Sequence, residues 1–188
     1  MVFAERAGNS SVVWLAASEG RAWGLLGHAE QARAAIARAD NAWNTVRSDE
    51  MDEMDEMGGV ATFSRHRQLY FAADALAWLA DQAAATQDYS AEAVAAYADP
   101  ADPDWAFGDA AGSRADLAIA RVRQGEVDGA AEILAPVLDL PIEQRINGIV
   151  HSVERVHGAL DGTTSTDGVE LQQRIEDYTR TPLRALPR

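Results

Sequence analysis

The stretch LAASEGRAWGLLGHAEQARAAIARADNAW, residues 15–43, decides the fold. Its apolar residues recur at intervals of three and four, which is the spacing of one face of an α-helix. Gly27 interrupts the pattern near its middle, and glycine is the residue that most often follows the C-terminus of a helix. We therefore predict two helices, over residues 11–26 and 29–46, that are joined by a turn at Gly27.

The spacing of small and large residues in this stretch occurs a second time in the chain. Counted from Gly20 and from Ala118, both registers use the offsets 0, 3, 7, 12, 16 and 19. A small residue lets the two helices of a hairpin approach, a large residue fills the adjoining space, and glycine makes the turn between them. The two sets are Gly20, Trp23, Gly27, Ala32, Ile36 and Ala39, and Ala118, Arg121, Gly125, Ala130, Leu134 and Val137.

The rest of the chain also has helical periodicity and lacks β-branched runs, so the predicted fold class is all-α. We predict that Thr62 or Ser64 caps the helix that contains Leu69 and Leu76. Ser90 is predicted to cap a short helix that ends at Tyr97, before the prolines of the acidic loop. Further helices are predicted over residues 109–124, 126–138, 142–160 and 168–179, which makes eight helices in four pairs.

These features resemble the tetratricopeptide repeat, a helix-turn-helix unit of about 34 residues that stacks into a superhelix. More narrowly, residues 15–43, DPDWAFGDAAGSRADLAIARVRQGEVDGAAEILAPVLDLP (102–141) and EQRINGIVHSVERVH (143–157) are similar to the C-terminal tetratricopeptide-like region of actinobacterial transcriptional regulators. The resemblance implies one domain over residues 1–188, an α-solenoid of about four antiparallel helix hairpins that senses a ligand or mediates assembly. In that family an N-terminal helix-turn-helix domain binds DNA, and we expect the residues before Ser11 to be too few to form one.

Composition excludes several classes of function. The chain has 188 residues and contains no cysteine, which excludes disulfides, a thiolate nucleophile and a zinc-thiolate site. Its net charge of -14, with acidic excess in residues 49–57 and 83–109, disfavours direct binding of nucleic acid. No apolar run approaches the roughly 20 residues that span a bilayer, so we predict a cytoplasmic protein without membrane partners.

Two stretches contain metal-ligand residue types without metal-ligand spacing. The run RSDEMDEMDEMGG, residues 47–59, lacks the oxygen ligands that a calcium loop needs at its third and fifth places, so it is interpreted as an acidic linker over residues 47–61. In HSVERVH, steps of three along a helix place His151 and His157 about 120° apart, too far round the helix to chelate one ion easily. No metal and no cofactor is predicted.

Motifs of covalent catalysis are also missing. The chain has no Gly-x-Ser-x-Gly elbow and no phosphate-binding glycine loop. We therefore predict that the protein is not an enzyme and has no catalytic residues. The alternative is an enzyme or accessory protein of secondary metabolism that uses His151 and Glu154 as acid and base in a groove.

The tryptophans divide into two groups. Four of them are at helix positions that are compatible with a core, and we expect them to pack there: Trp14, Trp23, Trp43 and Trp78. Trp105 lies in the acidic Pro/Asp loop of residues 99–108, and we expect it to dock back onto the helices.

The resemblance also implies a binding groove, because the first helix of each pair lines the concave surface of a tetratricopeptide stack. Taken singly, each residue that this register places there fits an ordinary solvated position equally well. Together they suggest a site for a peptide carboxylate or an acidic side chain, since guanidinium groups pair bidentately with carboxylates. The predicted partner is a peptide or protein segment; the residues before Ser11 and the tail 180–188 either cap the stack or form a homodimer contact. The groove candidates are Arg21, Arg67, Tyr70, Asp74, Asn147, His151, Glu154 and Arg155.

Overall fold

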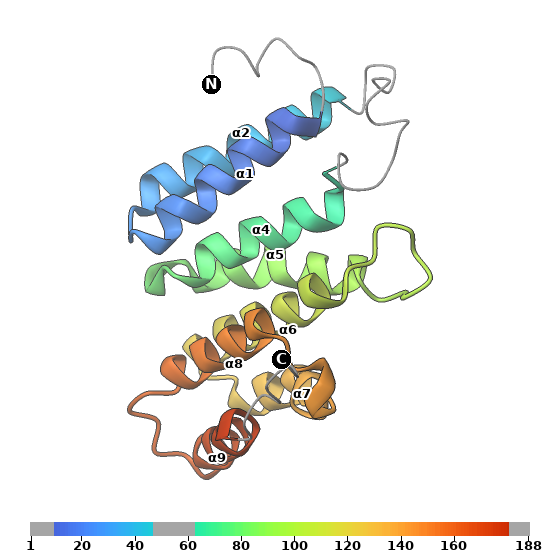
Figure 1. Ribbon diagram of the computed structural model, residues 1–188. Helices are drawn as coiled ribbons and strands as arrows, with labels where there is room; N and C mark the ends of the chain where they lie inside the picture. The colour runs from blue at the N-terminus through green and yellow to red at the C-terminus, as the bar shows by residue number, and fades with distance from the viewer. Residues whose placement is uncertain (1–9, 47–62, 181–188) are drawn as a thin grey trace, which may run out of the picture.

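The computed structural model describes residues 10–46 and 63–180, and all regular secondary structure within these ranges is helical (Figure 1). The prediction of an all-α chain is therefore confirmed. The predicted linker, Thr62 and most of the tail lie outside the described residues. The elements are α1 (Ser10–Leu25), α2 (Ala29–Val46), α4 (Arg65–Ala77), α5 (Ala83–Ala96), α6 (Phe107–Arg123), α7 (Val127–Leu138), α8 (Asn147–Ala159) and α9 (Thr166–Arg180), with 3-10 turns at Ala80–Gln82 and Ile142–Gln144.

The helices pack as consecutive pairs, α1 with α2, α4 with α5, α6 with α7 and α8 with α9. The first helix of each pair also contacts the first helix of the next, so α1, α4, α6 and α8 follow one another down the molecule (Figure 1). This row brings side chains from distant parts of the sequence to one surface. No helix in the described ranges is long and apolar enough to cross a membrane.

The repeated spacing of the sequence has a structural counterpart. Gly27 and Gly125 have φ values of 76° and 83°, a region that glycine enters without steric cost, and each follows the first helix of a pair. A Cβ added at Gly20 would lie 3.3 Å from Cγ1 of Ile36, so the small residue of the register faces its large partner across the α1–α2 contact. Trp23 is half-buried, and the remaining apolar members are buried: Ala32, Ala39, Ala118, Ala130, Leu134 and Val137.

The helices α1 and α4 approach each other closely at Gly24. A Cβ added at Gly24 would overlap the backbone carbonyl of Ala75. Only glycine permits this packing distance, and the alanines of the facing helix contribute by being short. This contact sets how near side chains of α1 come to those of α4.

Two predicted helix boundaries are wrong. The helix α5 begins at Ala83, and Ser90 is buried inside it, where its hydroxyl donates to the carbonyl of Thr86 at 2.6 Å. No Gly or Pro interrupts the preceding residues, so the helix simply starts earlier. The helix predicted over residues 142–160 is broken, because Arg145 and Ile146 leave helical geometry before α8 begins. In contrast, the Ser64 cap is confirmed, since its hydroxyl accepts from the Arg67 amide at 3.3 Å.

The tryptophan predictions have mixed outcomes. Trp23 and Trp43 are half-buried against the apolar clusters of the N-terminal helices, as expected. Trp105 is half-buried near Phe107, so its docking is confirmed. The core prediction is wrong for Trp14 and Trp78, which are 53% and 42% exposed. Trp14 lies on the side of α1 away from its contacts with α2 and α4, and Trp78 packs against the guanidinium of Arg155.

Candidate binding pocket

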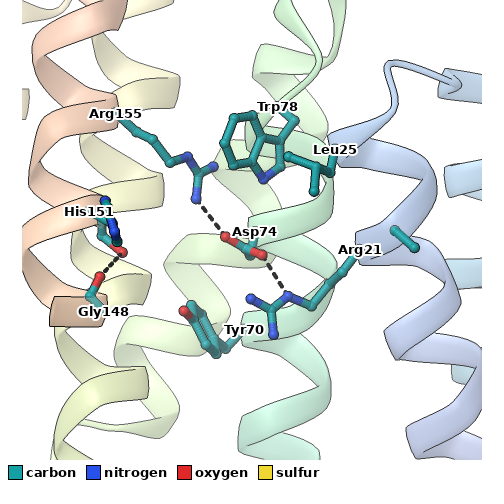
Figure 2. Close-up of a pocket in the computed structure, with 10 residues that line it drawn as sticks. Arg21, Leu25, Tyr70, Asp74, Trp78, Gly148, His151 and Arg155 are labelled. Atoms are coloured by element: carbon teal, nitrogen blue, oxygen red, sulfur yellow. Dashed lines mark hydrogen bonds and ion pairs between the residues drawn. The ribbon is translucent and has the colours of Figure 1, made fainter.

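A pocket opens between α1, α4 and α8 on the row of first helices (Figure 2). Its volume is about 410 Å³, within the range of sites that accept small ligands or a few amino-acid side chains. Its walls combine charged, aromatic and aliphatic groups. The lining residues are Arg21, Ala22, Leu25, Tyr70, Asp74, Trp78, Gly148, His151, Ser152 and Arg155.

Asp74 lies at the centre of the pocket and is bound by two arginines from different helices. Nε of Arg21 on α1 donates to Oδ2 of Asp74 at 2.6 Å, and Nη1 of Arg155 on α8 donates to Oδ1 at 2.5 Å (Figure 2). The Asp74 side chain is only 7% exposed. One carboxylate on α4 therefore ties together helices that are far apart in the sequence.

Aromatic rings orient both arginines. The guanidinium of Arg155 lies 4.3 Å from the ring centroid of Trp78, and that of Arg21 lies 4.4 Å from the ring centroid of Phe71. These distances suit cation–π contacts. Burial disfavours the charged form of Arg21, but Asp74 outweighs it and raises the pKa of Arg21. The Nη groups of Arg21 have no hydrogen-bond partner among the described residues, so they are available to a ligand.

A second carboxylate lies behind the pocket on α6. Asp116 is 1% exposed, and its Oδ1 is 3.4 Å from Nη2 of Arg155. Within the described part of the chain, no partner in hydrogen-bond geometry exists for either carboxylate oxygen of Asp116 or for Nη2 of Arg155. Burial raises the pKa of Asp116 well above its usual range; Asp74 raises it further, while Arg155 opposes the rise. Burial and the nearby Arg155 also lower the pKa of Arg123.

Tyr70 contributes a neutral hydroxyl to the pocket. A Cβ added at Gly112 of α6 would lie 2.7 Å from this hydroxyl, so glycine makes room for the phenol. Burial raises the pKa of Tyr70, and Asp116 and Asp74 raise it further. The hydroxyl therefore keeps its proton at neutral pH and can donate it in a hydrogen bond.

The groove candidates separate into residues that line the pocket and residues that do not. Glu154 lies outside the lining but contacts His151, with 3.0 Å between Oε2 and Nδ1, and both side chains are largely solvent-exposed. Arg67 is paired with Asp109 of α6 at 3.0 Å, and Asn147 is the exposed first residue of α8. The candidates that do line the pocket are Arg21, Tyr70, Asp74, His151 and Arg155.

Sequence reasoning missed three groups at this site. Trp78 follows Tyr70 and Asp74 at intervals of four, which places all three on one face of α4 and is a signal that could have identified it. Leu25 lies four residues after Arg21 on the same face of α1. Asp116 is a charged residue within an otherwise apolar run of α6, and its burial signals a role beyond solvation.

Comparison of the chain with protein-family models, with curated proteins and with solved structures finds no match in any of the three. The functional argument therefore rests on the pocket. Counting Arg21 and Arg155 against Asp74, its charged lining has a net charge of +1, in a chain whose net charge is -14.

Proposed function

We propose that the chain is a tetratricopeptide-like binding module, an α-solenoid of four antiparallel hairpins that binds a peptide or protein segment in the pocket between α1, α4 and α8. The repeat architecture is supported by the shared register around Gly27 and Gly125 and by the row of first helices. In stacks of this kind the concave face is the binding surface. In this chain the pocket opens on the row of first helices, α1, α4, α6 and α8.

One observation carries the choice of ligand: two arginines of the pocket share a single carboxylate. Arg21 and Arg155 exceed Asp74 by one positive charge, and the Nη groups of Arg21 remain available. A guanidinium binds carboxylate through two parallel hydrogen bonds. Beside it, exposed Leu25 and Trp78 form an apolar wall for a neighbouring side chain. The ligand is a segment that presents a carboxylate next to an apolar group.

The role of this module is ligand sensing or assembly within a bacterial transcriptional regulator in the cytoplasm, without enzymatic activity. The pocket joins helices from three of the four pairs, so an occupant contacts all three at once. Such an occupant stabilises one relative arrangement of the pairs. The strongly acidic chain repels nucleic acid, which assigns DNA contact to another part of the assembly.

The test is binding of blocked short peptides that carry one Glu beside an apolar residue, against the same peptides with Gln. We expect the Glu peptides to bind more tightly and to change the fluorescence of Trp78, which lines the pocket. Arg21→Ala should weaken Glu-peptide binding about tenfold, the equivalent of one lost charge-assisted hydrogen bond. Arg33→Ala, on the exposed face of α2, is the control and should bind as the wild type. Equal binding of Glu and Gln peptides would contradict the proposal.

A further inference from the structure

One side of α1 is apolar and packs against no other helix of the described residues. Four large side chains there are exposed: Trp14 by 53%, Leu15 by 44%, Leu25 by 61% and Leu26 by 64%. With Ser18 and Ala22 they occupy an arc of about 120° around the helix axis. This set, which we call the α1 face, contains no charged residue. The opposite side of α1 packs against α2 and α4.

The other peripheral helices have polar exposed sides. On α2, the large exposed residues include Glu30, Gln31, Arg33, Asn41 and Asn44. On α9, Val169 is the apolar exception among exposed residues that include Asp167, Glu170, Gln173, Arg174 and Glu176. Outer helices of a helical stack need such polar surfaces to stay soluble. The α1 face departs from this rule, so it has the character of an interface.

The order of residue sizes along the α1 face is symmetric. Two large residues are followed by Ser18 and Ala22 and then by two more large residues, and the centre of this pattern is residue 20. If a second α1 lies antiparallel across the centre, Ser18 of each helix faces Ala22 of the other. These small side chains let the helices approach to the usual 8–10 Å. At both ends, Trp14 then meets Leu25 of the second copy, and Leu15 meets Leu26.

The charged residues that flank the α1 face are compatible with this pairing. Arg21 is bound to Asp74 at 2.6 Å, and Glu19 is bound to Arg38 at 2.8 Å. Each of these two flanking charges therefore has an ion-pair partner within its own copy. A surface that meets itself across a twofold axis must be self-complementary, and a symmetric, uncharged, apolar pattern has this property.

We propose that two copies of this chain associate through their α1 faces, as an antiparallel pair of α1 helices related by a twofold axis. One helix per protomer buries less than the roughly 800 Å² per partner of a standard interface. The dimer is therefore weak, with a dissociation constant in the micromolar range, and Trp14 is its main anchor. The argument for the dimer does not use the pocket ligand, although Ala22 and Leu25 belong to both surfaces.

Sedimentation velocity of the full chain between about 1 and 500 µM tests the association. We expect a monomer at the low end, a dimer at the high end, and at least tenfold weaker association for Leu15→Glu. Gln31→Glu places the same charge on the exposed side of α2 and should associate as the wild type. Thermal melting of both variants checks that they remain folded. A monomer at every concentration, or equal association of Leu15→Glu and wild type, would overturn the proposal.

Because the chain contains no cysteine, cross-linking can test the register directly. A disulfide needs Cα atoms about 4.4–6.8 Å apart. In the proposed pairing this condition is met between residue 18 of one copy and residue 22 of the other. A mixture of Ser18→Cys and Ala22→Cys chains should therefore form a mixed disulfide several times faster than either variant links to itself. Faster linking of either variant alone would refute the antiparallel register centred on residue 20.

Discussion

Replacing Asp74 by Asn should lower stability and raise affinity for carboxylates. The substitution keeps the size of the side chain but removes the negative charge that Arg21 and Arg155 share. The charged lining of the pocket then changes from +1 to +2. The two effects have opposite signs in two different assays, so general damage to the fold cannot produce both.

The size of each effect follows from the burial of the partners. The Arg155 side chain is mostly buried, and its charge would lose a short hydrogen bond that water cannot fully replace. Arg21 is more exposed and can turn towards solvent, so breaking its ion pair with Asp74 costs less stability. Together we expect about 2–3 kcal/mol of lost unfolding free energy, below the full cost of breaking a buried ion pair. The freed donors should tighten carboxylate binding about tenfold or more.

Urea unfolding followed by circular dichroism measures the stability, and titration with acetate and with the blocked Glu peptides measures the affinity. Asp109→Asn is the matched control, because Asp109 also accepts from an arginine, Arg67, at 3.0 Å but does not line the pocket. It should lose stability without gaining affinity. If Asp74→Asn binds carboxylates more weakly than the wild type, the assignment of the arginines as ligand donors is refuted.

Three further predictions concern helix packing, the pH dependence of stability and the apolar wall of the pocket. Gly24→Ala should lower the unfolding free energy by about 2 kcal/mol, although alanine is the better helix former, because its Cβ would overlap the Ala75 carbonyl. The control is Gly158→Ala, where a Cβ meets nothing within 4 Å, and this variant should be neutral or slightly stabilising. Urea unfolding compares the two. Asp116→Asn should be more stable than the wild type near neutral pH. Burial raises the pKa of Asp116 in the folded state, so the wild type loses stability as the pH rises above the pKa that Asp116 has in the unfolded chain. The advantage of the variant should therefore vanish near about pH 3. Melting curves from pH 3 to 8 that show a constant difference would contradict this. Trp78→Ala should weaken Glu-peptide binding more than Trp43→Ala, since only Trp78 lines the pocket, and equal losses by fluorescence or calorimetry would exclude a wall role for Trp78.

Local signals explain which parts of the fold could be predicted. The turns at Gly27 and Gly125 and the cap at Ser64 depend on residues a few positions apart, and their predictions hold. The break before α8 depends on a distant contact, because Arg145 donates to the carbonyls of Leu140 and of Tyr178 on α9. No residue near position 145 in the sequence indicates the contact with Tyr178.

The pocket was predictable only in part for the same reason. Helical periodicity places Tyr70 and Asp74 on one face of α4, and that face does line the pocket. The tetratricopeptide register that selected these two residues also selected Arg67, whose side chain instead binds Asp109 of α6. Helix position assigned Trp14 to the core, whereas the packing of α1 on α2 and α4 leaves that ring exposed.

By itself, the sequence determined that this chain is helical, where most of its helices begin and end, and which residues share a helix face, because these properties depend on neighbours within a few positions. Only the tertiary structure decided which charges meet. Asp74 binds Arg21 from 53 residues away and Arg155 from 81 residues away. Those contacts depend on the packing distance between α1, α4 and α8, which glycine and alanine at the helix contacts set and which no periodicity within a single helix encodes.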